Sequence, residues 1–141
     1  MKKNRADLAR GWTRKAESDI AAALRTIESA GPYDTACFHC QQAAEKYLKA
    51  FLAWYEQPIP KTHDIEELVF LSSKIQPLLE NFDFPAEELS AYAVEMRYDE
   101  DFWPDIETAK NALREVEKLW KKLKEFLPDN FKSLTFPLQK P

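Results

Sequence analysis

The chain has 141 residues, of which 45% are hydrophobic and 13% aromatic, enough to build one domain around a single core without disulfide or metal support. Only 2 glycines occur, which argues against a strand-rich fold with many tight turns, and no apolar run is long enough for a membrane span. The net charge of −4 is divided unevenly, because residues 1–15 carry six basic residues against one acid and residues 78–107 carry ten acids against one arginine.

The N-terminal segment is basic but lacks the apolar stretch of a secretory signal. We therefore expect a cytoplasmic protein in which Cys37 and Cys40 are reduced thiols. The uneven charge has two interpretations: it steers a charged partner, or it reflects two solvated helix faces of opposite sign.

The first predicted helix runs from about Arg5 to Ala30 and ends at the stop signal Gly31-Pro32. Its apolar side chains recur every three or four residues and form one face. Asp19 falls inside that face. A carboxylate placed there needs a cation or several hydrogen-bond donors, or it takes up a proton.

The second predicted helix, residues 35–56, organises the chain. At about 100° per residue its apolar side chains cover more than half of the circumference, so it is predicted to lie at the centre of a bundle, with Asp34 or Thr35 as its cap. Its remaining strip is polar and consists of His39, Gln42, Glu45, Lys46 and Lys49.

A third, shorter helix is predicted from Asp64 to Ile75, before Pro77. Asp64 and Glu67 have the spacing of a capping box, with Asp in place of Ser or Thr. His63 stands immediately before this helix. It could be a general base, although no nucleophile pairs with it in the sequence, or it could have a structural role at the helix start.

Two more helices complete the pattern. Pro85 is predicted at the first position of a helix over residues 85–96, residues 97–103 are predicted as a loop, and Pro104 is predicted to open a last helix that ends near Leu127. The apolar seam of this last helix is Ile106, Ala109, Leu113, Val116, Trp120, Leu123 and Leu127.

The sequence after Leu127 shows no helical period. We therefore predict a helical bundle over residues 1–127 and a non-helical tail over residues 128–141 that docks on a surface through its apolar residues. These are Phe131, Leu134, Phe136 and Leu138.

Two groups of residues suggest a metal or redox site. Cys37, His39 and Cys40 supply only three of the four ligands that zinc needs, and no strand precedes them as in redox CxxC motifs, so both cysteines are interpreted as small core residues. The acidic residues of the second group could hold Mg²⁺ or form a solvated loop followed by helix-start acids, which is the preferred interpretation. They are Asp99, Glu100, Asp101 and Asp105.

Four segments together resemble the HEPN (higher eukaryotes and prokaryotes nucleotide-binding) domain family, in its prokaryotic stand-alone type. They are KAESDIAAA with Asp19, CFHCQQAAEKYLKAFL, the P-x-P-x-THDIEEL segment and YAVEMRYDEDFWP. The resemblance covers about residues 6–127 and implies an all-α fold, a four- to five-helix up-and-down bundle that pairs into a homodimer.

The resemblance also implies a function. Many relatives act with a small nucleotidyltransferase as a toxin–antitoxin pair, and catalytic members are metal-independent RNases with an Arg-x(4–6)-His motif. Arg97 matches the arginine, but residues 102, 103 and 104 are Phe, Trp and Pro, so the histidine of the motif is missing.

We therefore expect a binding module rather than an enzyme, with no cofactor or metal, no membrane association, a nucleotidyltransferase-like partner, and a nucleotide or RNA as ligand. The expected ligand-binding residues are Arg97, Tyr98, Asp19, Lys46 and His39. The alternatives are a metal-independent RNase that uses Arg97 with Tyr98 or His39, and a purely structural interaction protein.

Three features of the structure can be predicted from these residues. Asp19 should be buried and paired with Lys46, Lys49 or Arg97. Arg97 should be structural or ligand-orienting, with the acids that follow it as possible partners. The apolar face of the second helix, the last helix's seam and the tail should together form a dimer interface.

Overall fold

The computed structural model describes residues 3–132, and over these residues the fold is all-helical. The long helices are α1 (Arg5–Glu28), α2 (Tyr33–Trp54) and α5 (Ile106–Lys124), and the shorter ones are α3 (Ile65–Ile75), the 3-10 helix η1 (Pro77–Leu79), α4 (Ala86–Tyr98) and α6 (Asp129–Lys132). The all-α bundle predicted from the sequence is thus confirmed. Within the described residues, none of the helices has the length and apolar character needed to cross a membrane.

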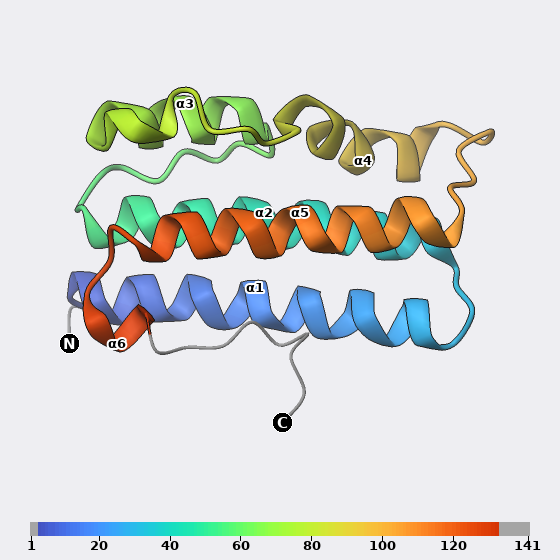
Figure 1. The fold of residues 1–141 in the computed structure, drawn as a ribbon, viewed down its shortest axis with the longest axis horizontal. Helices are drawn as coiled ribbons and strands as arrows, with labels where there is room; N and C mark the ends of the chain where they lie inside the picture. Colours follow the sequence, from blue (N-terminus) through green and yellow to red (C-terminus); the bar gives the residue numbers. More distant parts are fainter. Residues whose placement is uncertain (1–2, 133–141) are drawn as a thin grey trace.

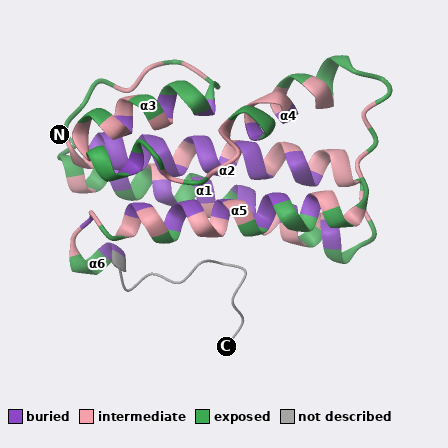
Figure 2. Cartoon of the chain, turned by 45° about the horizontal axis from the view of Figure 1, so that its top comes forward, coloured by how far each residue is buried: buried purple, intermediate pink, exposed green. Residues whose placement is uncertain are grey.

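Helix α2 is the centre of the bundle, as predicted. It contacts α1, α3, α4 and α5, and most of its residues are buried (Figure 2). Figure 1 shows α1 on one side of α2 and α5, with α3 and α4 end to end on the other side. The two short helices meet where the backbone N–H of Ile65, the first residue of α3, donates to Ser90 Oγ of α4 at 2.8 Å.

Short-range signals set most of the helix ends. Asn4 caps α1 by accepting a hydrogen bond from the Asp7 N–H at 2.9 Å, and Asp64 caps α3 through the N–H groups of Glu66 and Glu67. After α1 the chain turns at Ala30 and Gly31, which both have positive φ. The Gly31 N–H donates to the Thr26 carbonyl at 2.8 Å, so the end of α1 is closed by a backbone hydrogen bond.

Three predicted helix starts were wrong. Helix α2 begins at Tyr33 with Pro32 as its cap, so Asp34 and Thr35 lie inside its first turn, where Asp34 Oδ1 accepts from the Thr35 N–H. Pro85 precedes α4 as its cap rather than serving as its first residue. Helix α5 is capped by Asp105, whose side chain accepts from the Thr108 N–H, so it does not open at Pro104.

Two further corrections concern the ends of α4 and of the chain. Helix α4 continues through Arg97 and Tyr98 and ends at Asp99, so Arg97 lies in a last helical turn and not in a loop. The tail is not uniformly non-helical, because residues 129–132 form α6. Phe131 of α6 is buried, with its ring edge-on to Trp54 at 5.9 Å between centroids. Leu134, Phe136 and Leu138 lie outside the described residues.

The apolar seam of α5 faces its own chain. Ala109, Leu113, Val116, Trp120 and Leu123 are all buried within the bundle, and Trp120 stacks on Tyr47 of α2 at 4.4 Å between ring centroids. Because the α5 seam is covered within its own chain, it is not available for the dimer interface predicted from the sequence. Large hydrophobic side chains remain exposed at other places: Leu8, Phe70, Leu78, Val94, Tyr98 and Trp103.

The uneven charge of the sequence becomes a difference between the two ends of the bundle. Figure 1 shows that α1 begins and α5 ends at the same end of the molecule, so the basic first turns of α1 and the last turn of α5, with Lys121, Lys122 and Lys124, belong to one end. The acidic connection between α4 and α5 lies at the opposite end. We call these the basic end and the acidic end.

Candidate functional site

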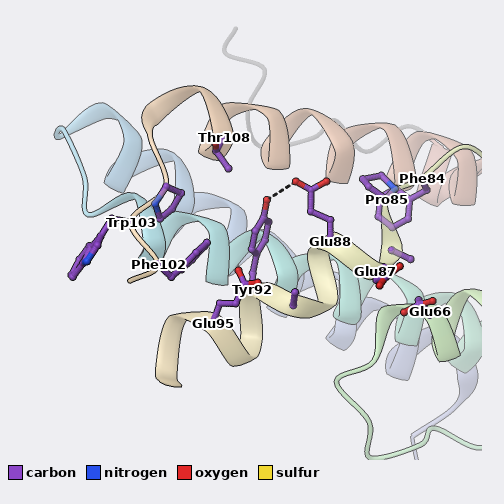
Figure 3. A pocket seen from close by; sticks show the side chains of 13 residues that line it. Glu66, Phe84, Pro85, Glu87, Glu88, Tyr92, Glu95, Phe102, Trp103 and Thr108 are labelled. Atoms are coloured by element: carbon purple, nitrogen blue, oxygen red, sulfur yellow. Dashed lines mark hydrogen bonds between the residues drawn. The ribbon is translucent and has the colours of Figure 1, made fainter. Parts of the chain in front are cut away.

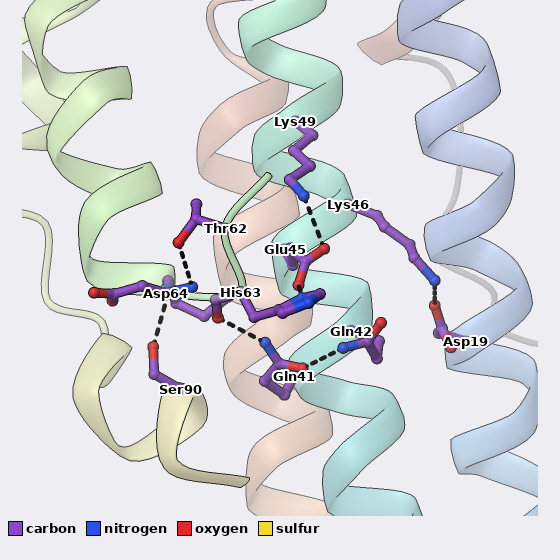
Figure 4. A network of polar contacts seen from close by, with 11 residues as sticks. Asp19, Gln41, Gln42, Glu45, Lys46, Lys49, Thr62, His63, Asp64 and Ser90 are labelled. Atoms are coloured by element: carbon purple, nitrogen blue, oxygen red, sulfur yellow. Dashed lines mark hydrogen bonds and ion pairs between the residues drawn. The ribbon is translucent and has the colours of Figure 1, made fainter. Parts of the chain in front are cut away.

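Two buried carboxylates contact the polar strip of α2, and Figure 4 shows them between α1 and the α3–α4 pair. The first is Asp19 of α1, only 8% exposed. Lys46 Nζ lies 2.6 Å from Asp19 Oδ2, and His39 Nδ1 lies 2.8 Å from Asp19 Oδ1. His39 and Lys46 are seven residues apart on α2, two helical turns, and so share one face. Both Asp19 oxygens are thus held by nitrogens of α2.

The second buried carboxylate is Glu45 of α2, only 3% exposed. Lys49 Nζ lies 3.0 Å from Glu45 Oε2, and His63 Nδ1 lies 2.8 Å from Glu45 Oε1. The buried Gln41 side chain donates from Nε2 to the His63 carbonyl at 3.0 Å. These contacts fasten the segment before α3 to α2, which agrees with the structural interpretation of His63.

The prediction for Asp19 is confirmed for burial and for Lys46 as its cation. Lys49 is instead the partner of Glu45, with its ammonium also 5.4 Å from the Trp12 ring centre. Sequence reasoning did not predict the contact between Asp19 and His39, although the i, i+7 spacing of His39 and Lys46 places both toward α1.

Arg97 lies in a different environment from the one predicted. Its side chain is exposed, and its guanidinium carbon lies 5.6 Å from the centre of the Phe38 ring. Within residues 3–132 no carboxylate forms a salt bridge with it. The nearby acids have other roles, since Asp99 Oδ1 accepts a hydrogen bond from the Asp101 N–H at 2.9 Å. The expectation that these acids would bind Arg97 was wrong.

The contacts join four of the five expected ligand residues into one cluster. Arg97 lies over Phe38, Phe38 lies edge-on to His39 at 5.7 Å between ring centroids, and His39 contacts Asp19, which pairs with Lys46. We call Arg97, Phe38, His39, Asp19 and Lys46 the Arg97 cluster. Tyr98 is 79% exposed beside it, at the end of α4.

Both cysteines are core residues, as interpreted from the sequence, with no exposed area. Burial raises the pKa of the Cys37 thiol to about 12, and the nearby carboxylates of Asp34 and Glu88 add to the shift. Burial also raises the pKa of Cys40. A thiol with so high a pKa is a poor nucleophile. In the part of the chain that the structure describes, no three His, Cys, Asp or Glu side chains are grouped as metal ligands.

The acidic connection after α4 is a solvated loop followed by a helix cap. Asp105 Oδ1 accepts hydrogen bonds from the Thr108 N–H at 2.8 Å and from Thr108 Oγ1 at 2.9 Å. These bonds lower the pKa of Asp105, because they favour its ionised form. Its helix-start role is the one preferred from the sequence.

Comparison with known protein families gives a match. The family model described as "HEPN domain" matches residues 9–126, which includes every residue of the Arg97 cluster. No curated protein and no solved structure matches the chain. The match extends over most of the chain, from the first turns of α1 to just past the end of α5, and its span is close to the one expected from the sequence. The chain therefore belongs to the HEPN domain family.

Proposed function

We propose that this chain is a non-catalytic binding module that holds a phosphate-bearing ligand, either a nucleotide or an RNA strand, at the Arg97 cluster. Membership of the HEPN family supports a nucleotide-binding or RNase-type module. The observation that carries the proposal is the state of Arg97, whose guanidinium is exposed, lies over Phe38 and forms no salt bridge within residues 3–132. A planar guanidinium of this kind can hold a phosphate through two parallel hydrogen bonds.

The surroundings of Arg97 suit a nucleotide. Tyr98 follows it and presents an exposed ring, on which a base can stack. Lys46 and His39 are occupied by Asp19, so they would shape the floor of the site rather than supply free charge. Asp99, Glu100 and Asp101 lower the local potential, which favours a small ligand held by specific contacts over non-specific binding of a long polyanion.

Two partners belong to the proposal. The first is a second copy of the chain, whose contact we place on the outer layer formed by α3 and α4, where Phe70 and Val94 are exposed. The second is a small nucleotidyltransferase-like protein, in a toxin–antitoxin or other nucleotide-linked setting. The resemblance to the family is what supports both. The alternative of a purely structural interaction protein shares these partners but lacks the ligand.

Metal-independent RNA cleavage is the second candidate, and one observation favours it. Asp19 contacts His39 through Nδ1, which leaves Nε2 free to contact a ligand. The His39 ring also lies beside the Phe38 ring, over which the Arg97 guanidinium packs. A general base must reach the ribose 2′-OH directly or through one water. The His39 side chain is 28% exposed, so part of it is accessible to a ligand.

Nucleotide binding tests the proposal. Calorimetric titration with ATP, GTP and inorganic phosphate should detect binding to the wild type, and Arg97→Ala should weaken it by about tenfold or more, the effect of losing a charge-assisted contact. Arg114→Ala, which removes an exposed arginine from α5, is the matched control and should bind like the wild type. Equal affinities for the two variants would contradict the role of Arg97.

Incubation with single-stranded RNA and transfer RNA in the presence of a chelator separates binding from cleavage. We expect no cleavage by the pure protein. Specific cleavage that is lost in both Arg97→Ala and His39→Ala would replace the binding proposal by the RNase.

A further inference from the structure

A groove with aromatic and acidic side chains lies along a face of α4 other than the one that carries Arg97. Figure 3 shows a groove between α4, the connection after it and the start of α5, with a volume of about 940 Å³. This is at the upper end of the roughly 300–1,000 Å³ range of ligand sites, so the groove accommodates more than one side chain. Rings line much of it: Phe84, Pro85, Tyr92, Phe102, Trp103 and Pro104.

Four carboxylates share the groove with these rings, namely Glu66, Glu87, Glu88 and Glu95. No lysine or arginine lines it, and none of the four forms a salt bridge within residues 3–132. Glu88 accepts a hydrogen bond from the Tyr92 hydroxyl at 3.0 Å. The groove is therefore apolar along its rings and negative along its rim, without a counter-charge of its own.

The negative potential of this groove reaches the groups beneath it. Burial is the main cause of the raised pKa of Tyr92, but Glu88 and Glu95 raise it further. The same two carboxylates contribute to the raised pKa of Cys37. A phosphate would be repelled from this surface, so the groove is not an extension of the proposed nucleotide site.

We propose that this groove docks a short cationic segment of a partner protein, in which lysine or arginine alternates with apolar side chains. The carboxylates would form charge-assisted hydrogen bonds with the cations. Trp103, 75% exposed, offers its face to a cation, and the Phe and Pro rings offer contact to apolar side chains. Within the described residues, the Trp103 ring has no cation or ring partner of its own, so it is available to an occupant of the groove.

The groove and the Arg97 cluster occupy different faces of α4. Glu88, Tyr92 and Glu95 follow one another at i, i+4 and i+7 and so line one face, whereas Arg97 is about 200° around the helix from Glu95. The chain cannot fill its own groove with its basic α1, because α1 lies on the other side of α2. The occupant that we propose is therefore a segment of another molecule, and the two sites can be tested separately.

The experiment uses a fluorescein-labelled nine-residue peptide in which lysine alternates with leucine, and a counterpart with glutamate at each lysine position. Fluorescence anisotropy should show binding of the lysine peptide alone, and added salt should weaken it. The double variant Glu87→Gln/Glu95→Gln should lose about tenfold in affinity or more. The control Glu67→Gln/Glu80→Gln, with the same loss of charge at two exposed positions outside the groove, should lose little.

Each outcome of this experiment either supports or overturns the binding of a cationic segment to the groove. Tighter binding to wild type than to the groove variant, with Arg97→Ala unaffected, supports the proposal. Equal binding by the groove variant and the control, or binding of the glutamate peptide, overturns it. Sedimentation in which the groove variant alone loses self-association would also overturn it, because the occupant would then be a second copy of this chain. The proposal does not depend on nucleotide binding, so either site can fail alone.

Discussion

A carboxylate in the apolar face of a helix keeps its charge only if other groups replace the water that it has lost. For Asp19, Lys46 and His39 supply this replacement at 2.6 and 2.8 Å. The two nitrogens come from a neighbouring helix, so the ion pair also fixes the register of α1 against α2. Asp19, whose place in the apolar face was unexpected from the sequence, thus links the two longest helices, α1 and α2.

The first prediction concerns the ion pair of Asp19 with Lys46. Asp19→Ala should lower the free energy of unfolding by about 3 kcal/mol, the low end of the range for a broken buried pair, because the Lys46 side chain is still 21% exposed. Urea denaturation measures the change. Asp83→Ala removes an acid whose side chain is fully exposed and should leave the midpoint where it is. Equal midpoints for both variants would contradict a buried, paired Asp19.

The second prediction concerns pH. The hydrogen bonds from Thr108 lower the pKa of Asp105 below its ordinary value of 3.8. The ionised cap therefore contributes stability above pH 3.8, and the contribution is lost as the pH falls through the lowered folded pKa. Asp105→Ala should melt below the wild type at pH 7, and the two melting temperatures should begin to converge only as the pH falls below about 4.

Glu100→Ala provides the control for this titration. Its side chain is exposed, and no hydrogen bond to it occurs among the described residues, so its variant should show no convergence. A difference between wild type and Asp105→Ala that stays constant from pH 7 to pH 3 would contradict the capping role.

At the scale of elements, periodicity accounts for most of what the sequence predicted. The central position of α2 followed from its wide apolar surface, and the paired Asp19 followed from its place in the face of α1. Helix α6 could not be found in this way, because four residues are too few to show a period. The end of α4 was placed too early because the charges around Arg97 resemble a loop, although a helix with one exposed face carries such charges equally well.

The contacts that sequence reasoning missed join segments far apart in the chain. His63 reaches Glu45 because the segment before α3 runs back along α2, and no local pattern encodes that path. The groove draws on α3, α4, the connection after α4 and the start of α5. Its four glutamates resemble ordinary solvated residues until the fold brings them around the same set of rings.

The third prediction concerns α6. Phe131 is buried against Trp54, so it anchors the end of the described chain to the end of α2. Phe131→Ala should cost about 3 kcal/mol of stability, as for other buried aromatic residues. Leu78→Ala, which truncates a side chain that is 66% exposed and lies outside the proposed dimer contact, is the control and should cost far less. Similar chemical denaturation curves for the two variants would show that α6 is not held in place.

At the scale of the whole molecule, the fourth prediction concerns self-association. We expect a symmetric dimer that buries on the order of 1,200 Å² or more. Because the apolar seam of α5 is covered by its own chain, the exposed apolar residues of α3 and α4 are the place to test. Val94→Asp should shift sedimentation toward the monomer, whereas Leu78→Asp, at a somewhat more exposed residue of η1, should not. A wild type that remains monomeric at high micromolar concentration would remove the dimer.

The separation of the basic and acidic ends changes what the net charge of −4 means for an approaching molecule. Helix α1 alone, with 24 residues, spans roughly 36 Å, several times the screening length of about 8–10 Å in physiological salt. Each end is therefore electrically isolated from the other. A nucleic acid that approaches the start of α1 meets positive charge, and a basic protein that approaches the α4–α5 connection meets negative charge. Neither responds to the net charge of the whole chain. Toward approaching molecules the chain therefore presents two surfaces of opposite charge that act independently of each other.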